Sequence, residues 1–156
     1  MTRERTAAAG AAALAQTSGE LRIETAGAGF YDITREVAAW LEETGAREGL
    51  LTLFLRHTSA SLTIQENADP DVLDDLMDAL ERIASQSHPY RHSSEGSDDM
   101  PAHIKAMATA TSLTIPVAQG RMALGTWQGV YVIEHRARRH ARRLALHFLG
   151  GFEERA

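Results

Sequence analysis

The 156-residue chain has no cysteine, which excludes disulfide bonds, thiolate nucleophiles and cysteine-ligated metal sites. It also has only four prolines, few aromatic residues and no apolar run long enough to span a membrane. We find no P-loop, G-x-G-x-x-G, G-x-S-x-G or H-E-x-x-H motif, so common nucleotide, hydrolase and metalloprotease signatures are absent. Histidines and carboxylates are therefore the groups left for catalysis or metal binding.

The charge balance further narrows the class of partner. Sixteen basic and 21 acidic residues give a net charge of -5, which argues against a general nucleic-acid or membrane-surface binder. The length is ordinary for one domain with a real core. A chain without cysteine is compatible with a reducing compartment, and we expect a cytoplasmic protein.

The first 18 residues differ from the rest in composition. Their apolar run is mostly alanine, too weakly hydrophobic for a signal peptide, so we expect a flexible Ala-rich extension over 1–18. The folded domain should span 19–152.

Hydrophobic periodicity predicts alternating strands and helices over that domain. A helix capped by Asp32 or Thr34 should end at Gly45, a second should open at Pro70, and a third should begin near residue 100. Strands are predicted at about 20–26, 50–55, 62–65, 111–117, 122–124, 130–133 and 144–149.

The helix after Pro70 has a clear amphipathic pattern. Its apolar positions should form an inner face against the core: Val72, Leu73, Leu76, Met77, Leu80 and Ile83. Its aspartates are expected on a solvated face.

The segment 91–105 is rich in groups that suit a site and poor in apolar side chains. Pro101 fits the first turn of a helix, with Asp98 or Asp99 before it as the N-cap. Imidazole and carboxylate are usual ligands of zinc, and carboxylates with retained water suit magnesium. The pattern predicts a divalent metal, Mg or Zn, on His92, Asp98 and His103. The plainer alternative is that acidic residues gather at helix starts simply because they cap them.

Polar residues also follow two predicted strands. His57, Thr58 and Ser59 come directly after the strand 50–55, and such strand ends commonly carry ligand groups. His135 and Arg136 follow the strand 130–133, where the arginine could reach an anion. Most of the five arginines between 136 and 143 are explained by a solvated basic turn.

Four blocks together resemble one known family. They are 57–70 (HTSASLTIQENADP), 90–92 (YRH), 95–105 (EGSDDMPAHIK) and 124–130 (LGTWQGV) with 134–136 (EHR). In this order they resemble the YjbQ family, also called UPF0047 or the secondary thiamine-phosphate synthase family. The resemblance covers roughly residues 20–150.

The resemblance implies a single α+β domain in which mixed or antiparallel sheets pack as a sandwich with flanking helices. It also implies a homotrimer that binds a small phosphorylated metabolite, and a weak thiamine-phosphate synthase activity, as main or side reaction. Carried over by position, the family's polar motif positions fall on His57, Thr58, Ser59, Asn67, Asp69, Arg91, His92, Asp98, His103, Thr126, Gln128 and His135. Of these, Thr58, Ser59, Asn67, Arg91, Thr126 and Gln128 are expected to bind the substrate and its phosphate, together with Arg136 at the strand end. The implied catalytic residues are His57, Asp98, His103 and His135.

That reaction joins an aminopyrimidine-methyl diphosphate to a thiazole phosphate and expels pyrophosphate. A divalent ion and nearby cations would stabilise the charge that develops on the leaving group. Two other classes of function stay open at this point, a metal-dependent hydrolase and a non-catalytic trimer that binds a phosphorylated metabolite. Metal content should separate the three hypotheses.

Overall fold

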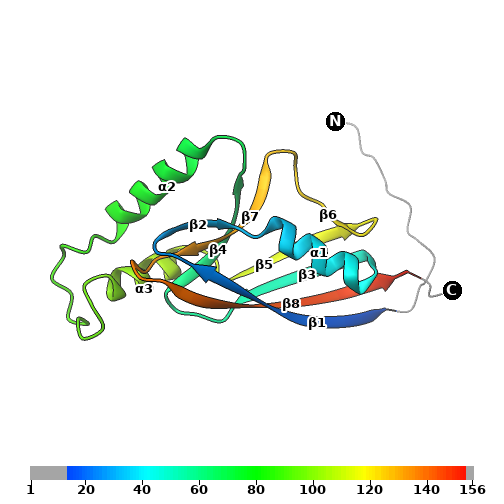
Figure 1. Cartoon of the computed structure of the whole chain (residues 1–156), viewed down its shortest axis with the longest axis horizontal. Helices are drawn as coiled ribbons and strands as arrows, with labels where there is room; N and C mark the ends of the chain where they lie inside the picture. Colours follow the sequence, from blue (N-terminus) through cyan, green and yellow to red (C-terminus); the bar gives the residue numbers. More distant parts are fainter. Residues whose placement is uncertain (1–13, 154–156) are drawn as a thin grey trace.

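Two antiparallel sheets and three helices make up the part of the chain that the computed structural model describes, residues 14–153 (Figure 1). The first sheet has the order β1 (Ala15–Thr25), β8 (His140–Phe152), β3 (Ala46–Leu55), β5 (Ser112–Ala118) and β6 (Arg121–Met122). The second has the order β2 (Gly29–Asp32), β7 (Gln128–Glu134) and β4 (Ala60–Glu66). The helices are α1 (Thr34–Thr44), α2 (Pro70–Ile83) and α3 (Asp99–Ala108). The predicted α+β class is confirmed.

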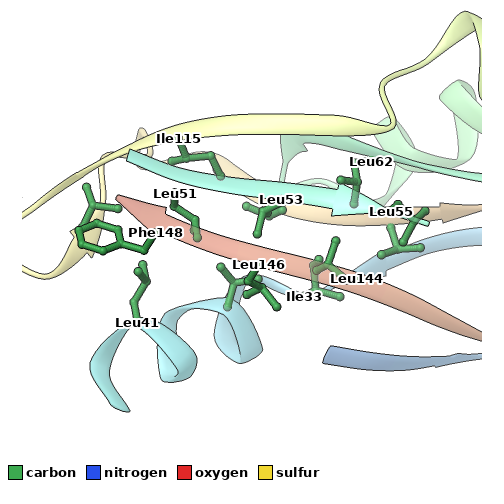
Figure 2. Packing of buried hydrophobic residues seen from close by; sticks show 14 of the residues in the cluster. Ile33, Leu41, Leu51, Leu53, Leu55, Leu62, Ile115, Leu144, Leu146 and Phe148 are labelled. Carbon is green, nitrogen blue, oxygen red and sulfur yellow. The ribbon is translucent and has the colours of Figure 1, made fainter. Parts of the chain in front are cut away.

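The core follows from strand alternation. On β3, Leu51, Leu53 and Leu55 are buried, whereas Leu50 and Phe54 on the opposite face remain 48% exposed. Successive strand residues point to opposite faces, so one face of the first sheet is buried and the other is open. Figure 2 shows the buried face packed against α1 and against Leu62 of the second sheet.

Several predicted boundaries need correction. Residues 1–13 lie outside the described residues, but residues 15–18 of the predicted extension belong to β1, where Ala15 pairs with Gly150. β3 and β8 are longer than predicted, because sheet pairing recruits polar and glycine residues that have no apolar pattern of their own. The strand β2 was missed, since four residues give too short a pattern to recognise. The strand expected at 122–124 is limited to Arg121–Met122.

Helix α1 begins and ends close to the predicted residues. The carboxylate of Asp32 accepts a hydrogen bond from the Thr34 N–H at 2.8 Å, although Ile33 occupies the N-cap position itself. Gly45 ends the helix in the left-handed region, at φ 72°, where its N–H donates to Glu42 O. The predicted stop at Gly45 is confirmed.

Helix α2 departs most from its sequence-based description. Asp69 caps it by accepting the Asp71 N–H at 3.0 Å, and its aspartates are exposed as expected. Its apolar face is only partly covered, however: Leu80 is buried and Ile83 is 60% exposed, while Val72, Leu73, Leu76 and Met77 are half-buried. Figure 1 shows α2 standing apart from both sheets. The prediction of an inner face packed on the core was wrong for the protomer, since periodicity reveals amphipathicity but not its partner.

The pairing of β4 with β7 determines where the predicted site residues next to these two strands lie. Ala60 lies opposite Glu134 at one end of this pair, and Glu66 lies opposite Gln128 at the other. Since a strand rises about 3.4 Å per residue, the two ends are roughly 20 Å apart. None of the helices among the described residues is long and apolar enough to cross a membrane.

Candidate functional site: a His–Asp–His cluster at the end of β7

Two imidazoles and one carboxylate meet at the start of α3. One ligand atom from each of His92, Asp99 and His103 lies within 4.8 Å of the other two. Nε2 of His92 is 2.7 Å from Oδ2 of Asp99, and Nε2 of His103 is 3.4 Å from the same oxygen. Asp99 and His103 come together because they are four residues apart on one helix face, while His92 enters from the preceding loop.

The carboxylate in this cluster belongs to Asp99, which corrects the predicted ligand set of His92, Asp98 and His103. Asp98 points elsewhere: its Oδ2 accepts from Arg136 Nε at 3.1 Å and from the Ala137 N–H at 2.9 Å. Adjacent residues at a helix start are about 100° apart around the axis, so only one of the two aspartates can share the face of His103. Asp98 occupies the N-cap position of α3 but makes no side-chain cap hydrogen bond.

The orientation of the His103 ring is fixed by its second ring nitrogen. Nδ1 lies 3.0 Å from the carbonyl oxygen of Thr58. A carbonyl only accepts, so Nδ1 carries a proton and donates it to Thr58 O, and Nε2 is the ring nitrogen that faces Asp99. A histidine that donates its other N–H to a backbone carbonyl is the usual arrangement of a metal ligand. The donor set therefore fits a transition-metal ion such as zinc, with coordination positions left open.

Asp99 is almost fully buried yet ionised. Burial raises the pKa of its carboxyl, but the hydrogen bond with His92 and the positive charge of Arg136 outweigh burial, so the pKa lies below its ordinary value. Asp98 behaves similarly, since its hydrogen bonds with Ala137 and Arg136 overcome burial and lower its pKa. Both acids are thus present as carboxylates at neutral pH.

Arg136 links the loop before α3 to the end of β7. Its guanidinium donates to Oδ1 of Asp99, to both carboxylate oxygens of Asp98 and to the carbonyl oxygen of Glu95. Its side chain is only 14% exposed. It was predicted as a phosphate ligand, but its donors are directed at carboxylates and a carbonyl of its own chain.

A second ionic group lies behind the cluster and was not recognised in the sequence. Glu134 is fully buried and accepts from Arg142 through both of its oxygens, from Thr25 and from the Arg136 N–H. Burial raises the pKa of Glu134, but these hydrogen bonds outweigh it and hold the pKa below its ordinary value. A solvated basic turn explains most of the arginines between 136 and 143 but not Arg142, because the alternation of β8 turns this residue inward.

His135 lies in a separate buried group. Its Nε2 is 2.9 Å from the Ser61 hydroxyl, which is 2.6 Å from the Thr109 hydroxyl. Burial and the charge of Lys105 lower the pKa of His135 to about 4, so the ring is neutral. Within residues 14–153 its Nδ1 has no hydrogen-bond partner. With 3% of its surface exposed, the ring is shielded from solvent in this chain.

His57, Thr58 and Ser59 line a cavity of about 530 Å³ together with Phe54, Leu55, Arg56 and Thr111. Nε2 of His57 accepts the Arg143 N–H at 2.7 Å, and burial and Arg142 lower the pKa of this ring. The cavity adjoins the cluster through Thr58, whose carbonyl holds His103. The strand end thus brings predicted anion-binding residues next to the candidate metal ligands.

The remaining predicted residues lie elsewhere. Asn67 and Gln128 are at the opposite end of the β4–β7 pair, where Asn67 N–H donates to Trp127 O and the Gln128 side chain accepts from Gly125 N–H. Thr126 belongs to the same exposed loop, and Arg91 is exposed beside His92. The structure does not bring this second group to the His–Asp–His cluster within this chain.

Fold and cluster together define an antiparallel α+β protein with a candidate metal centre beside a strand end. A family model described as "UPF0047 protein YjbQ-like" matches residues 19–151, and the chain belongs to this family.

Two curated relatives show how much of the chain is shared. It is 49% identical over 131 residues to UPF0047 protein sll1880 of Synechocystis, covering 83% of this chain and 89% of the relative. It is 48% identical over 109 residues to YjbQ of Salmonella typhimurium, covering 69% and 79%.

Two solved structures have a fold similar to that of this chain. A YbjQ-like protein of unknown function from Sulfolobus solfataricus superposes with a TM-score of 0.82 at 22% identity, over 89% of this chain and 100% of that one, which supports the fold alone. An uncharacterized conserved protein of the YjbQ family from Clostridium acetobutylicum gives a TM-score of 0.77 at 35% identity, over 83% and 98%.

Proposed function

We propose that this protein is a metal-dependent enzyme that acts on a phosphorylated metabolite, with the divalent ion held by His92, Asp99 and His103. The observation that carries the proposal is the convergence of three ligand atoms within 4.8 Å, one of them on a histidine whose tautomer suits a metal. Zinc and related ions are bound by this donor set, and three protein ligands leave a position for substrate or water.

The adjoining cavity would hold the phosphate groups. Arg56 supplies a cation at its wall, and the hydroxyls of Thr58, Ser59 and Thr111 can donate to phosphate oxygens. The carbonyl of Thr58 already fixes His103, so a substrate bound here would lie beside the metal ligands. The position of the cavity favours a substrate that reaches from the cavity to the metal ligands, such as a diphosphate.

The first candidate reaction is the transfer that the family resemblance implies. The bond between the pyrimidine methylene carbon and the diphosphate oxygen breaks, the thiazole nitrogen forms the new bond to that carbon, and pyrophosphate leaves. A bound divalent ion would offset the negative charge that develops on pyrophosphate. Each well-placed donor in such a site commonly contributes about 2.7–4 kcal/mol of transition-state stabilisation. In this chain the hydroxyls of Thr58 and Ser59, which line the adjoining cavity, would be such donors.

The second candidate is hydrolysis of a phosphate ester, favoured by the two imidazoles of the cluster. A His/His/Asp set is more typical of zinc than of magnesium, and zinc lowers the pKa of bound water. We further propose that the protein works in the cytoplasm as a homotrimer. A trimer that only binds a phosphorylated metabolite is the outcome expected if no metal is retained.

Metal analysis and turnover assays on the purified protein test the proposal. Stoichiometric zinc with release of inorganic phosphate would favour hydrolysis, whereas magnesium-dependent formation of thiamine phosphate from the two precursors would favour transfer. His103→Ala should abolish metal binding and turnover, while His147→Ala, which alters a histidine of β8 outside the cluster, should leave both intact. If the native protein bound neither zinc nor magnesium, the proposal of a metal-dependent enzyme would be refuted.

A further inference from the structure

The two oxygens of Asp99 have different partners. Oδ1 accepts from Nη1 of Arg136, whereas Oδ2 faces Nε2 of His92 at 2.7 Å and Nε2 of His103 at 3.4 Å. We propose that Arg136 is a positioning residue of the metal centre: by holding Oδ1 it presents Oδ2 alone, so that Asp99 binds the ion through one oxygen. The inference rests on the proposed metal centre and gives Arg136 a role other than phosphate binding.

Arg136 is itself held rigidly enough to act this way. Nε and Nη2 donate to Asp98 at 3.1 and 3.3 Å, and Nη2 also donates to the Glu95 carbonyl at 2.8 Å. Asp98 is fixed in turn by the Ala137 N–H. Four contacts from one planar guanidinium leave little freedom for the group, and a planar fork determines direction where a point charge does not.

The backbone of Arg136 is anchored as well. Its N–H donates to Glu134 Oε1 at 2.9 Å, and Glu134 is paired with the buried Arg142. A continuous set of ion pairs and hydrogen bonds therefore runs from the core of β8 to the carboxylate of Asp99. This continuity explains why an arginine 37 residues away from Asp99 can orient it.

Coordination through one oxygen has a chemical consequence. A carboxylate with both oxygens free can chelate the ion and occupy a further position. With Oδ1 engaged by Arg136, that position stays available to substrate or water, as catalytic metal sites require. Loss of the guanidinium fork should raise the coordination number and change the affinity for the ion.

The test uses Co²⁺ alone as the probe, since its visible absorption weakens as coordination number rises. Arg136→Lys keeps the charge but loses the fork. We expect Co²⁺ affinity to fall by about 10- to 100-fold, as for other residues that orient metal ligands, with weaker visible bands. Arg138→Lys, an exposed arginine two residues on, is the matched control and should equal the native protein.

A folded Arg136→Lys variant with native affinity and native spectrum would overturn the inference. Should this variant fail to fold, Asp98→Asn decides, because it loosens Arg136 while keeping both Arg136 and Asp99. Unchanged affinity and spectrum in Asp98→Asn would again overturn it, and a shift in the same direction would support it. If the native protein binds no Co²⁺ at all, the proposed metal centre fails, which is distinguishable from failure of the positioning role alone.

Discussion

The two ends of the β4–β7 pair hold polar residues in contrasting ways. At one end, two ion pairs are largely removed from water, Arg136 with Asp99 and Arg142 with Glu134. At the other, Asn67, Trp127 and Gln128 are exposed and joined by backbone hydrogen bonds of a short loop. Both ends carry residues of the family blocks, yet only the first groups titratable side chains into a cluster.

This difference between the two ends follows from the energetic cost of burying charged groups. A buried charge is costly unless a partner of opposite sign and hydrogen bonds satisfy it, so the ionic end is a connected network. An exposed amide loses little when a partner is removed, because water replaces it. Changes at the ionic end should therefore affect stability and chemistry much more than changes at the loop end.

The largest effect is expected for Glu134→Ala. This change leaves the Arg142 guanidinium buried without its partner, which typically costs about 3–5 kcal/mol of unfolding free energy. Gln128→Ala, the matched change at the loop end, should cost roughly 1 kcal/mol or less, because it removes one exposed hydrogen bond. Urea unfolding measures the loss of unfolding free energy in both variants. Equal losses would contradict the predicted difference between the two ends.

Titration of His135 should make stability depend on pH. Its pKa is about 4 in the folded chain and near 6.5 in the unfolded chain, so between these values the unfolded state binds more protons. Stability should therefore fall as pH drops from 6.5 to 4, by on the order of 3 kcal/mol, and then level off.

His135→Gln should flatten that profile, and His147→Gln should leave it unchanged. Unfolding free energies measured at several pH values would decide this. A His135→Gln protein with the native slope would mean that other groups produce the pH dependence.

Asp99→Ala should weaken metal binding at the ionic end by roughly 100-fold or more, since loss of a ligand should exceed the effect of losing an orienting partner. Competition with a chelating dye gives the affinity. Asp69→Ala, an exposed aspartate that caps α2 near the loop end, serves as the control and should bind the ion normally. An Asp99→Ala variant that bound the ion with native affinity would show that the ion binds at another site.

The smallest effect is expected for Trp127→Ala. The side chain is 65% exposed, so unfolding free energy should change by less than about 0.5 kcal/mol and metal affinity should not change. Calorimetry and a metal titration test both statements. A marked loss of stability would show that the loop end packs against another molecule in solution.

Part of the site could be predicted from local pattern. The segment 91–105 was identified by its histidines and acids, and the helix expected near residue 100 begins at Asp99. A further signal was available: Asp99 and His103 are four residues apart on that helix and therefore share a face. This spacing favours Asp99 over Asp98 as the carboxylate beside His103.

Other features could not be predicted because they depend on distant residues. The contact between Arg136 and Asp99 spans 37 residues, and Thr58 reaches His103 over 45. The separation of Asn67 and Gln128 from His92 follows from strand pairing, which places Glu66 opposite Gln128. The partial exposure of the apolar face of α2 likewise depends on packing that a single helix pattern does not specify.

The alternation of strands and helices, the end of α1 at Gly45 and the concentration of imidazoles and acids before α3 can all be derived from the amino-acid sequence, because they follow from periodicity and local backbone chemistry. The contact of Asp99 rather than Asp98 with the two histidines, and the buried pair of Arg142 with Glu134, emerge only from the folded chain. The partner of a side chain depends on its direction and burial, and both are set by how distant strands and helices pack.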